Sequence, residues 1–143
     1  MLPAGLGTVT ESAALSAWVR RFGGFLGVGA LATALQYVIL LLGVEGFHAN
    51  PVVASTVGFA LSSVANYSLN RRYTFRSQRR HASAAPRFAI VAIAGLLLNA
   101  LLMVVFADRA GLPYLVAQVC TTGIVLVVNF SAHALWSFAR ERN

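Results

Sequence analysis

Four long apolar stretches limit what this chain can fold into, because each is long enough to cross a lipid bilayer. A spanning helix needs about 20 mostly apolar residues, and the stretches that qualify are roughly residues 22–44, 50–70, 88–107 and 113–138. Only 10% of the 143 residues are charged and 58% are apolar, whereas a soluble domain averages about 25% charged residues. The sequence therefore predicts an all-α integral membrane protein with four transmembrane helices.

The segment before the first apolar stretch is more polar than the rest. It contains Glu11 and no basic residue before Arg20, unlike the basic start of a cleaved signal peptide. We expect residues 1–19 to be a flexible N-terminal tail that is retained, and residues 20–143 to be a single four-helix transmembrane domain. The single Cys120 allows no intrachain disulfide. The chain has no lysine, which argues against a Walker-type phosphate loop and Schiff-base chemistry.

The placement of the arginines predicts the orientation of the helices. Arg109 alone falls in a connection on one side, and the other ten arginines fall on the opposite side: Arg20, Arg21, Arg71, Arg72, Arg76, Arg79, Arg80, Arg87, Arg140 and Arg142. Basic residues concentrate on the cytoplasmic side of membrane proteins. We therefore predict that both termini are cytoplasmic.

The second and fourth apolar stretches end in the same pattern. At a constant offset of 63 residues the matched pairs are Asn66/Asn129, Asn70/His133, Tyr73/Trp136 and Phe75/Phe138. The hairpins also match at their starts, where Arg21-Phe22 resembles Arg87-Phe88, and Pro51 falls near Pro113. We predict two tandem two-helix repeats, related by an axis along the membrane normal because each unit has two spans. Any pocket is expected to lie between the hairpins.

Several amide side chains fall inside the apolar stretches, where they are unfavourable without a partner and should face the bundle interior. Gln36 and Gln118 are interpreted as interhelical hydrogen-bonding groups, each contributing about 0.6 kcal/mol. If Arg21 is aligned with Arg87, Thr33 and Asn99 occupy equivalent positions of the two repeats. The first helix also has a small-residue face with one Gly-x-x-x-Gly, which favours close helix contact within the chain or in a homodimer.

Amides, guanidinium groups and aromatic rings gather near the predicted cytoplasmic boundary. Guanidinium binds phosphate bidentately, so this mixture suits a phosphate with an attached sugar. The candidate ligand-binding residues are Asn66, Asn70, Arg71, Arg72, Tyr73, Asn99, Asn129, His133 and Trp136. The alternative interpretation is that the arginines obey the positive-inside rule and the aromatics form an interfacial belt. His133 is equally well explained as a titrating group or as a hydrogen-bonding spacer. We expect no catalytic residue, no metal, no cofactor and no nucleic-acid partner.

With these residues, the chain from about Val19 to Arg140 resembles the GtrA-like family of four-span bacterial membrane proteins. The resemblance rests on Arg21-Phe22, on the signature Asn66-Tyr67-x-x-Asn70-Arg71-x-Tyr73-Thr74-Phe75, and on its second copy from Asn129. It implies a multi-pass protein of the bacterial cytoplasmic (inner) membrane, linked to cell-surface polysaccharide synthesis. The implied activity is translocation of polyprenyl-phosphate-linked monosaccharides to the outer leaflet, where membrane glycosyltransferases use them.

The second copy of the signature in such proteins usually carries an arginine. Here Ala134 and Leu135 occupy that region, so the phosphate is expected to be held mainly by Arg71 and Arg72.

Three functions follow from the sequence, and none of them is an enzyme. The first is a lipid-linked sugar flippase, with transport that is passive or driven by the membrane potential because no ATP site is present. The second is a membrane scaffold that recruits a glycosyltransferase through the basic 71–87 connection. The third is a small multidrug exporter, against which the excess of arginine and the lack of a carboxylate in mid-membrane both argue.

Overall fold

The computed structural model describes residues 6–74 and 81–141, with side chains described for 10–72, except 18, 21, 22 and 25, and for 86–132. Over these residues the chain is helical between short connections and forms no strand, which confirms the predicted all-α fold. The main helices are α1 (Leu6–Leu41), α2 (Pro51–Leu69), α3 (His81–Met103) and α4 (Tyr114–Glu141). Each contributes a membrane-length apolar segment, namely Leu26–Gly46, Pro51–Arg72, Pro86–Arg109 and Tyr114–Ala132. The chain is therefore a multi-pass membrane protein.

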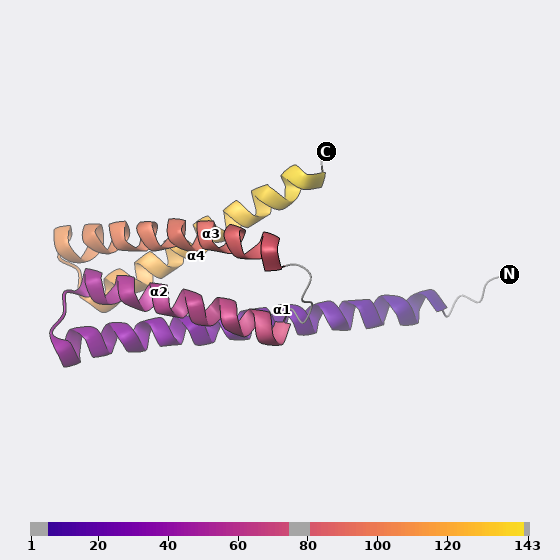
Figure 1. Ribbon diagram of the computed structural model, residues 1–143, viewed down its shortest axis with the longest axis horizontal. Coiled ribbons are helices and arrows are strands. Elements are labelled where there is room, and N and C mark those ends of the chain that lie inside the picture. The colour runs from indigo at the N-terminus through magenta and orange to yellow at the C-terminus, as the bar shows by residue number, and fades with distance from the viewer. Residues whose placement is uncertain (1–5, 75–80, 142–143) are drawn as a thin grey trace.

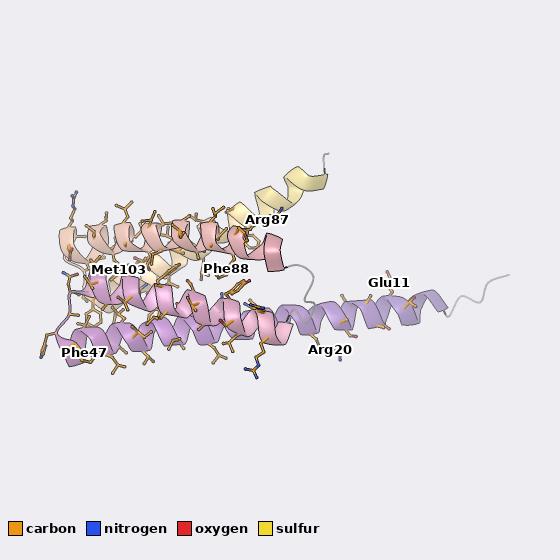
Figure 2. All side chains as sticks on the ribbon, in the orientation of Figure 1. Glu11, Arg20, Phe47, Arg87, Phe88 and Met103 are labelled. Carbon is orange, nitrogen blue, oxygen red and sulfur yellow. The ribbon has the colours of Figure 1, made fainter. Side chains whose placement is uncertain are left out.

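The helices form an elongated bundle with two different ends (Figure 1). At one end are the connections α1–α2 and α3–α4, with the labelled Phe47, and we call this the loop end (Figure 2). At the other end lie Arg71, Arg72 and Arg87, and we call this the arginine end. α1 runs on past the arginine end, and α4 crosses the other helices obliquely so that its C-terminal part leads away from them. The predicted cytoplasmic position of the termini stays a prediction.

Two helices start earlier than the apolar stretches suggest. α1 begins at Leu6, so residues 6–19 of the expected tail are helical and continue into the first span. This segment contains no proline, and between Gly7 and Gly23 it has no glycine either, so nothing in it interrupts a helix. α3 begins at His81, with Pro86 inside it, whereas the apolar stretch starts at residue 88. Hydropathy reports the length within the membrane, not the length of the helix.

Burial recurs from one hairpin to the other at an interval of 63 residues. Within the described side chains, each buried position between 32 and 62 has a buried counterpart 63 residues later. The matched pairs are Ala32/Gly95, Gln36/Asn99, Leu40/Met103, Ala54/Ala117, Ser55/Gln118, Gly58/Thr121 and Ser62/Val125. Most of these residues are small or carry an amide or hydroxyl group. Small residues allow close approach of helices inside a membrane, where polar groups provide further cohesion.

The two connections at the loop end also have matching geometry. α1 and α3 end in π-helical turns, η1 (Leu42–Gly46) and η4 (Val104–Arg109). The next left-handed residues are His48, with φ of 52°, and Gly111, with φ of 68°. Capping bonds then run from Ala49 N to Gly43 O (2.9 Å) and from Leu112 N to Phe106 O (3.0 Å). A left-handed residue is the common way to end a helix.

The start of α2 agrees with its sequence. Asn50 caps the helix, because its Oδ1 accepts a hydrogen bond from Val52 N at 2.8 Å. Pro51 occupies the first turn, where its missing N–H has no helical partner to lose.

The matched left-handed positions lead to a stability prediction. Gly111→Ala should lower the free energy of unfolding by about 1–2 kcal/mol, because a Cβ is unfavourable in the left-handed region. His48→Gly at the equivalent position should change it by no more than about 0.5 kcal/mol, because relief of that strain offsets the added backbone entropy of glycine. Unfolding in mixed detergent micelles, followed by circular dichroism, measures both. Equal effects of the two substitutions would contradict this interpretation of the loops.

Candidate functional site

One polar side chain from each helix meets in a buried hydrogen-bonded cluster, which we call the central network. Gln36 Nε2 and Gln118 Nε2 both donate to Asn99 Oδ1, at 3.4 and 3.3 Å. Asn99 Nδ2 donates to Ser55 Oγ at 2.9 Å, and the Ser55 hydroxyl donates to Gln118 Oε1. All four side chains are buried. The network therefore ties α1, α2, α3 and α4 together at one level of the bundle.

The network extends toward one side through hydroxyl groups. Gln118 Nε2 also lies 3.3 Å from Thr122 Oγ1, which shares a 3.1 Å hydrogen bond with Tyr37 OH. This chain of contacts joins α4 to α1. The prediction that Gln36 and Gln118 form interhelical hydrogen bonds is confirmed.

Asn99 is bonded to Gln36 of α1. The Thr33 hydroxyl donates to Gly29 O of its own helix at 2.9 Å. The alignment of Arg21 with Arg87 has an offset of 66 residues and therefore misplaces Thr33 by about one helical turn. At the offset of 63, Gln36 matches Asn99 and Ser55 matches Gln118. Two of the hydrogen bonds in the network thus join equivalent positions of the two hairpins.

A second polar cluster lies at the arginine end. Asn70 Nδ2 donates to Asn66 Oδ1 at 2.8 Å, so the two amides one turn apart on α2 are paired. Asn70 is buried, whereas Arg71 and Arg72 are exposed. These two arginines lie in the π-helical turn η2 (Asn70–Thr74), a conformation that is rare and frequently found at functional sites.

The two polar clusters are separate. Ser55 of the central network and Asn66 are eleven residues apart on α2, which is about 16 Å at 1.5 Å per residue. Of the candidate residues, the structure brings Asn66 and Asn70 together beside Arg71 and Arg72, and it places Asn99 in the network.

The remaining candidate residues lie on α4 and η2. Asn129 of α4 is half-buried and faces α3, because a Cβ built on Gly95 would lie 3.9 Å from its Nδ2. The side chains of Tyr73, His133 and Trp136 lie outside the described residues.

A groove lies between α2 and α3 on the arginine side of the central network, with a volume of about 380 Å³. It lies between the two hairpins, where the sequence predicts any pocket to be, but its lining residues include none of the candidate amides Asn66, Asn70, Asn99 and Asn129. Its less exposed lining forms two facing stripes with a spacing of four residues, Phe59, Ser63 and Tyr67 against Phe88, Ala92 and Leu96. The rings of Tyr67 and Phe88 lie 4.8 Å apart, tilted by 41°. Arg87, adjacent to Phe88, is exposed at the arginine end (Figure 2).

Charge is distributed unevenly between the two ends. The described acidic side chains are Glu11, Glu45 and Asp108, all exposed. Glu45 and Asp108 lie at the loop end, where Tyr114 OH donates to Glu45 Oε1 at 2.6 Å. Arg20, Arg71, Arg72 and Arg87 make the arginine end cationic. Among the described residues, the interior of the bundle holds amides and hydroxyls rather than ionised groups.

The hydroxyl members of the central network, Ser55, Tyr37 and Thr122, are not apparent from the sequence as functional residues. The sequence contains one indication of the network: the positions 63 residues after Gln36 and Ser55 are occupied by Asn99 and Gln118, which both carry an amide side chain. The groove between α2 and α3 has no such signal, since its lining is ordinary apolar sequence.

The fold and its polar groups define a class: a small four-span helical membrane protein with a neutral polar interior and one cationic end. A comparison with known families matches residues 24–138 to the GtrA/DPMS transmembrane domain family, and the chain belongs to that family. It is thus a membrane protein of the kind that handles sugars on glycosyl-carrier lipids. Searches of curated proteins and of solved structures gave no match.

The central network leads to a second stability prediction. Asn99→Leu should lower the free energy of unfolding by about 2 kcal/mol, because it removes three hydrogen bonds of about 0.6 kcal/mol each inside a membrane. The control is Thr56→Val, which removes a hydroxyl bonded only within α2, to Val52 O at 2.7 Å. Unfolding in mixed micelles measures both variants. A loss for Asn99→Leu no larger than the loss for Thr56→Val would show that the network does not hold the bundle together.

Proposed function

We propose that this protein moves a polyprenyl-phosphate-linked monosaccharide across the bacterial cytoplasmic membrane, for use by membrane glycosyltransferases in cell-surface polysaccharide synthesis. The main support is the arginine end, where two exposed guanidinium groups adjoin a paired amide cluster on a four-span bundle of the GtrA/DPMS family. The proposed transport needs no catalytic residue, metal or cofactor.

The chemistry of the headgroup matches the chemistry of this end. A phosphodiester is a singly charged anion whose oxygens accept hydrogen bonds, and guanidinium offers several donors in a fixed plane. In the proposal, Arg71 and Arg72 bind the phosphate, while Asn66 and Asn70 present amide groups to the sugar. Tyr73, His133 and Trp136 are proposed to line the same headgroup region, since they belong to the repeated signature.

Movement past the central network has a cost that can be compared with its driving force. The Asn99 amide makes three hydrogen bonds, to Gln36, Ser55 and Gln118. If the headgroup takes over these bonds as it passes, the bundle temporarily loses about 2 kcal/mol of interhelical hydrogen bonding, at about 0.6 kcal/mol per bond. An inside-negative potential favours outward movement of one negative charge by about 2.3 kcal/mol per 100 mV. We propose that Asn99 and Asn129 provide hydrogen bonds along the route, which lowers the barrier to passage, and that the membrane potential rather than ATP supplies the driving force.

The scaffold function remains a second candidate because of one feature. α1 continues past the arginine end as a helix, with Leu15 63% and Val19 54% exposed. Apolar side chains exposed on such an extension favour contact with a lipid surface or a partner protein. A scaffold would use this helix and the basic 71–87 connection, and it would not need Arg71 and Arg72 to contact a phosphate.

Leaflet exchange in proteoliposomes separates these functions. The purified protein is reconstituted with a fluorescent short-chain polyprenyl-phosphate sugar, and exchange is followed with a membrane-impermeant quencher. The double variant Arg71→Ala/Arg72→Ala should slow exchange at least about tenfold, because each charge-assisted hydrogen bond contributes about 1.5–3 kcal/mol. Asn66→Ala should slow it as well, since it removes one amide together with the hydrogen bond that Asn70 donates to it.

Two matched controls accompany these variants. Arg109→Ala removes an exposed arginine at the loop end, and Ser68→Ala alters an exposed residue two positions from Asn66. Both should exchange lipid at the wild-type rate. If wild type and all variants give the rate of protein-free liposomes while a glycosyltransferase still co-purifies with the chain, the scaffold function is correct and the transport proposal is wrong.

A further inference from the structure

The groove between α2 and α3 has a hollow at one level. Tyr67 packs on Phe88 at one end of the facing stripes. Because α2 and α3 run in opposite directions (Figure 1), the same register puts Phe59 level with Leu96 at the other end and Ser63 level with Ala92 between them. The middle pair consists of Ser63 and Ala92, the two smallest residues of the lining stripes. Two helices that run side by side with small residues opposite each other leave unfilled space there. The groove is therefore widest at Ser63 and Ala92. A bulky side chain from each helix bounds it toward the loop end (Phe59 and Leu96) and toward the arginine end (Tyr67 and Phe88).

The surroundings of this hollow indicate a hydrocarbon occupant. It lies within the membrane-spanning parts of both helices, and its lining is apolar apart from Ser63 and the Tyr67 hydroxyl. A buried water needs two to four polar partners, which such a lining does not supply. Benzene fills an apolar cavity of about 150 Å³. On that scale, 380 Å³ accommodates about fifteen carbon atoms, or about three isoprene units.

Polar and cationic residues surround the end of the groove that is nearest the arginine end, whereas the lining itself is apolar. Tyr67 follows Asn66, whose Oδ1 is bonded to Asn70, and Phe88 follows the exposed Arg87 (Figure 2). The same end carries Arg71 and Arg72. An occupant that runs along the groove would thus have an apolar chain beside Ser63 and Ala92 and would meet cationic and amide groups where the groove ends. Charge and apolar surface together match an anionic amphiphile with one phosphate at the end of its chain.

We propose that the α2–α3 groove binds the isoprene units next to the phosphate of the carrier lipid, with Arg87 contacting the phosphate. This assignment rests on the proposed function and adds a site for the tail to the headgroup site at Arg71 and Arg72. A methyl-branched chain suits a hollow bounded by side chains above and below, because its branches fill the width at Ser63 and Ala92. The tail would be held on one side of the bundle while the headgroup crosses.

The first experiment measures binding without transport. The protein in micelles is titrated with farnesyl phosphate, which has the three isoprene units and the phosphate but no sugar. Ala92→Phe fills the hollow and should weaken binding at least about tenfold. Ala94→Phe makes the same substitution two residues further along α3, at an exposed position outside the groove, and should bind like wild type. Arg87→Gln should weaken farnesyl phosphate binding but not the binding of farnesol.

A photoreactive farnesyl phosphate keeps the test independent of how well Ala92→Phe folds. With the wild-type protein, the labelled positions should lie on α2 between Phe59 and Tyr67 and on α3 between Phe88 and Leu96. A tenfold excess of phosphatidylglycerol should not displace the label, and inorganic phosphate should compete only weakly because it lacks the chain.

Several results would overturn the proposal. Equal binding by Ala92→Phe and Ala94→Phe would place the tail elsewhere. Full competition by phosphatidylglycerol would mean that ordinary acyl chains occupy the groove. A dimer that Ala92→Phe converts to a monomer, with unchanged farnesyl phosphate binding, would mean that a second copy covers it. Groove-specific binding together with absent leaflet exchange would refute the transport function alone, whereas normal exchange by a folded Ala92→Phe variant would refute the groove assignment alone.

Discussion

The scarcity of water inside a bilayer is the constraint on which this structure depends. An amide that enters hydrocarbon must find a partner within the protein, and here Gln36, Ser55, Asn99 and Gln118 find one another. Because each comes from a different helix, satisfying them sets the relative position of all four helices at that level. Around this level the packing uses small residues, such as Gly58, where a Cβ would lie 3.0 Å from Gln36 O. A single hydrogen bond in a membrane contributes little to stability. A network that joins four helices at one level nevertheless specifies how those helices are arranged relative to one another.

This central network lies between two halves of the bundle that differ in their polar groups. Toward the loop end, matching connections at His48 and Gly111 close both hairpins in the same way. Toward the arginine end, α4 leads away from the other helices (Figure 1) and the groove separates α2 from α3 over part of their length. The cationic residues and the paired amides Asn66 and Asn70 lie at this second end. A headgroup entering from the arginine end would therefore meet charged groups first and neutral hydrogen-bonding groups later. In this order the protein replaces the hydration of the headgroup step by step, which lowers the free-energy cost of desolvation.

The parts of this account that the sequence predicts are those set by local chemistry. Apolar length predicts four spans, Asn50 predicts a cap, and the spacing of Asn66 and Asn70 predicts that they are neighbours on one helix face. Features that depend on which residues of two helices lie opposite each other were not predicted. The hollow at Ser63 and Ala92 requires the register of α2 against α3, and the pairing of Gln36 with Asn99 was obscured by an alignment based on Arg21 and Arg87. The sequence does not predict the start of α1 at Leu6, because hydropathy identifies only the part of a helix that lies in the membrane.

The central claim is that the protein moves the lipid together with its one negative charge, so that the membrane potential drives the transport. The most direct measurement is the equilibrium distribution of a fluorescent polyprenyl-phosphate sugar between leaflets of wild-type proteoliposomes under an imposed potential. At 100 mV, inside negative, a free energy of about 2.3 kcal/mol predicts outer-leaflet enrichment of up to about fiftyfold, lost when the potential is collapsed. An even distribution that ignores the potential, reached at the same rate with and without protein, would contradict the account.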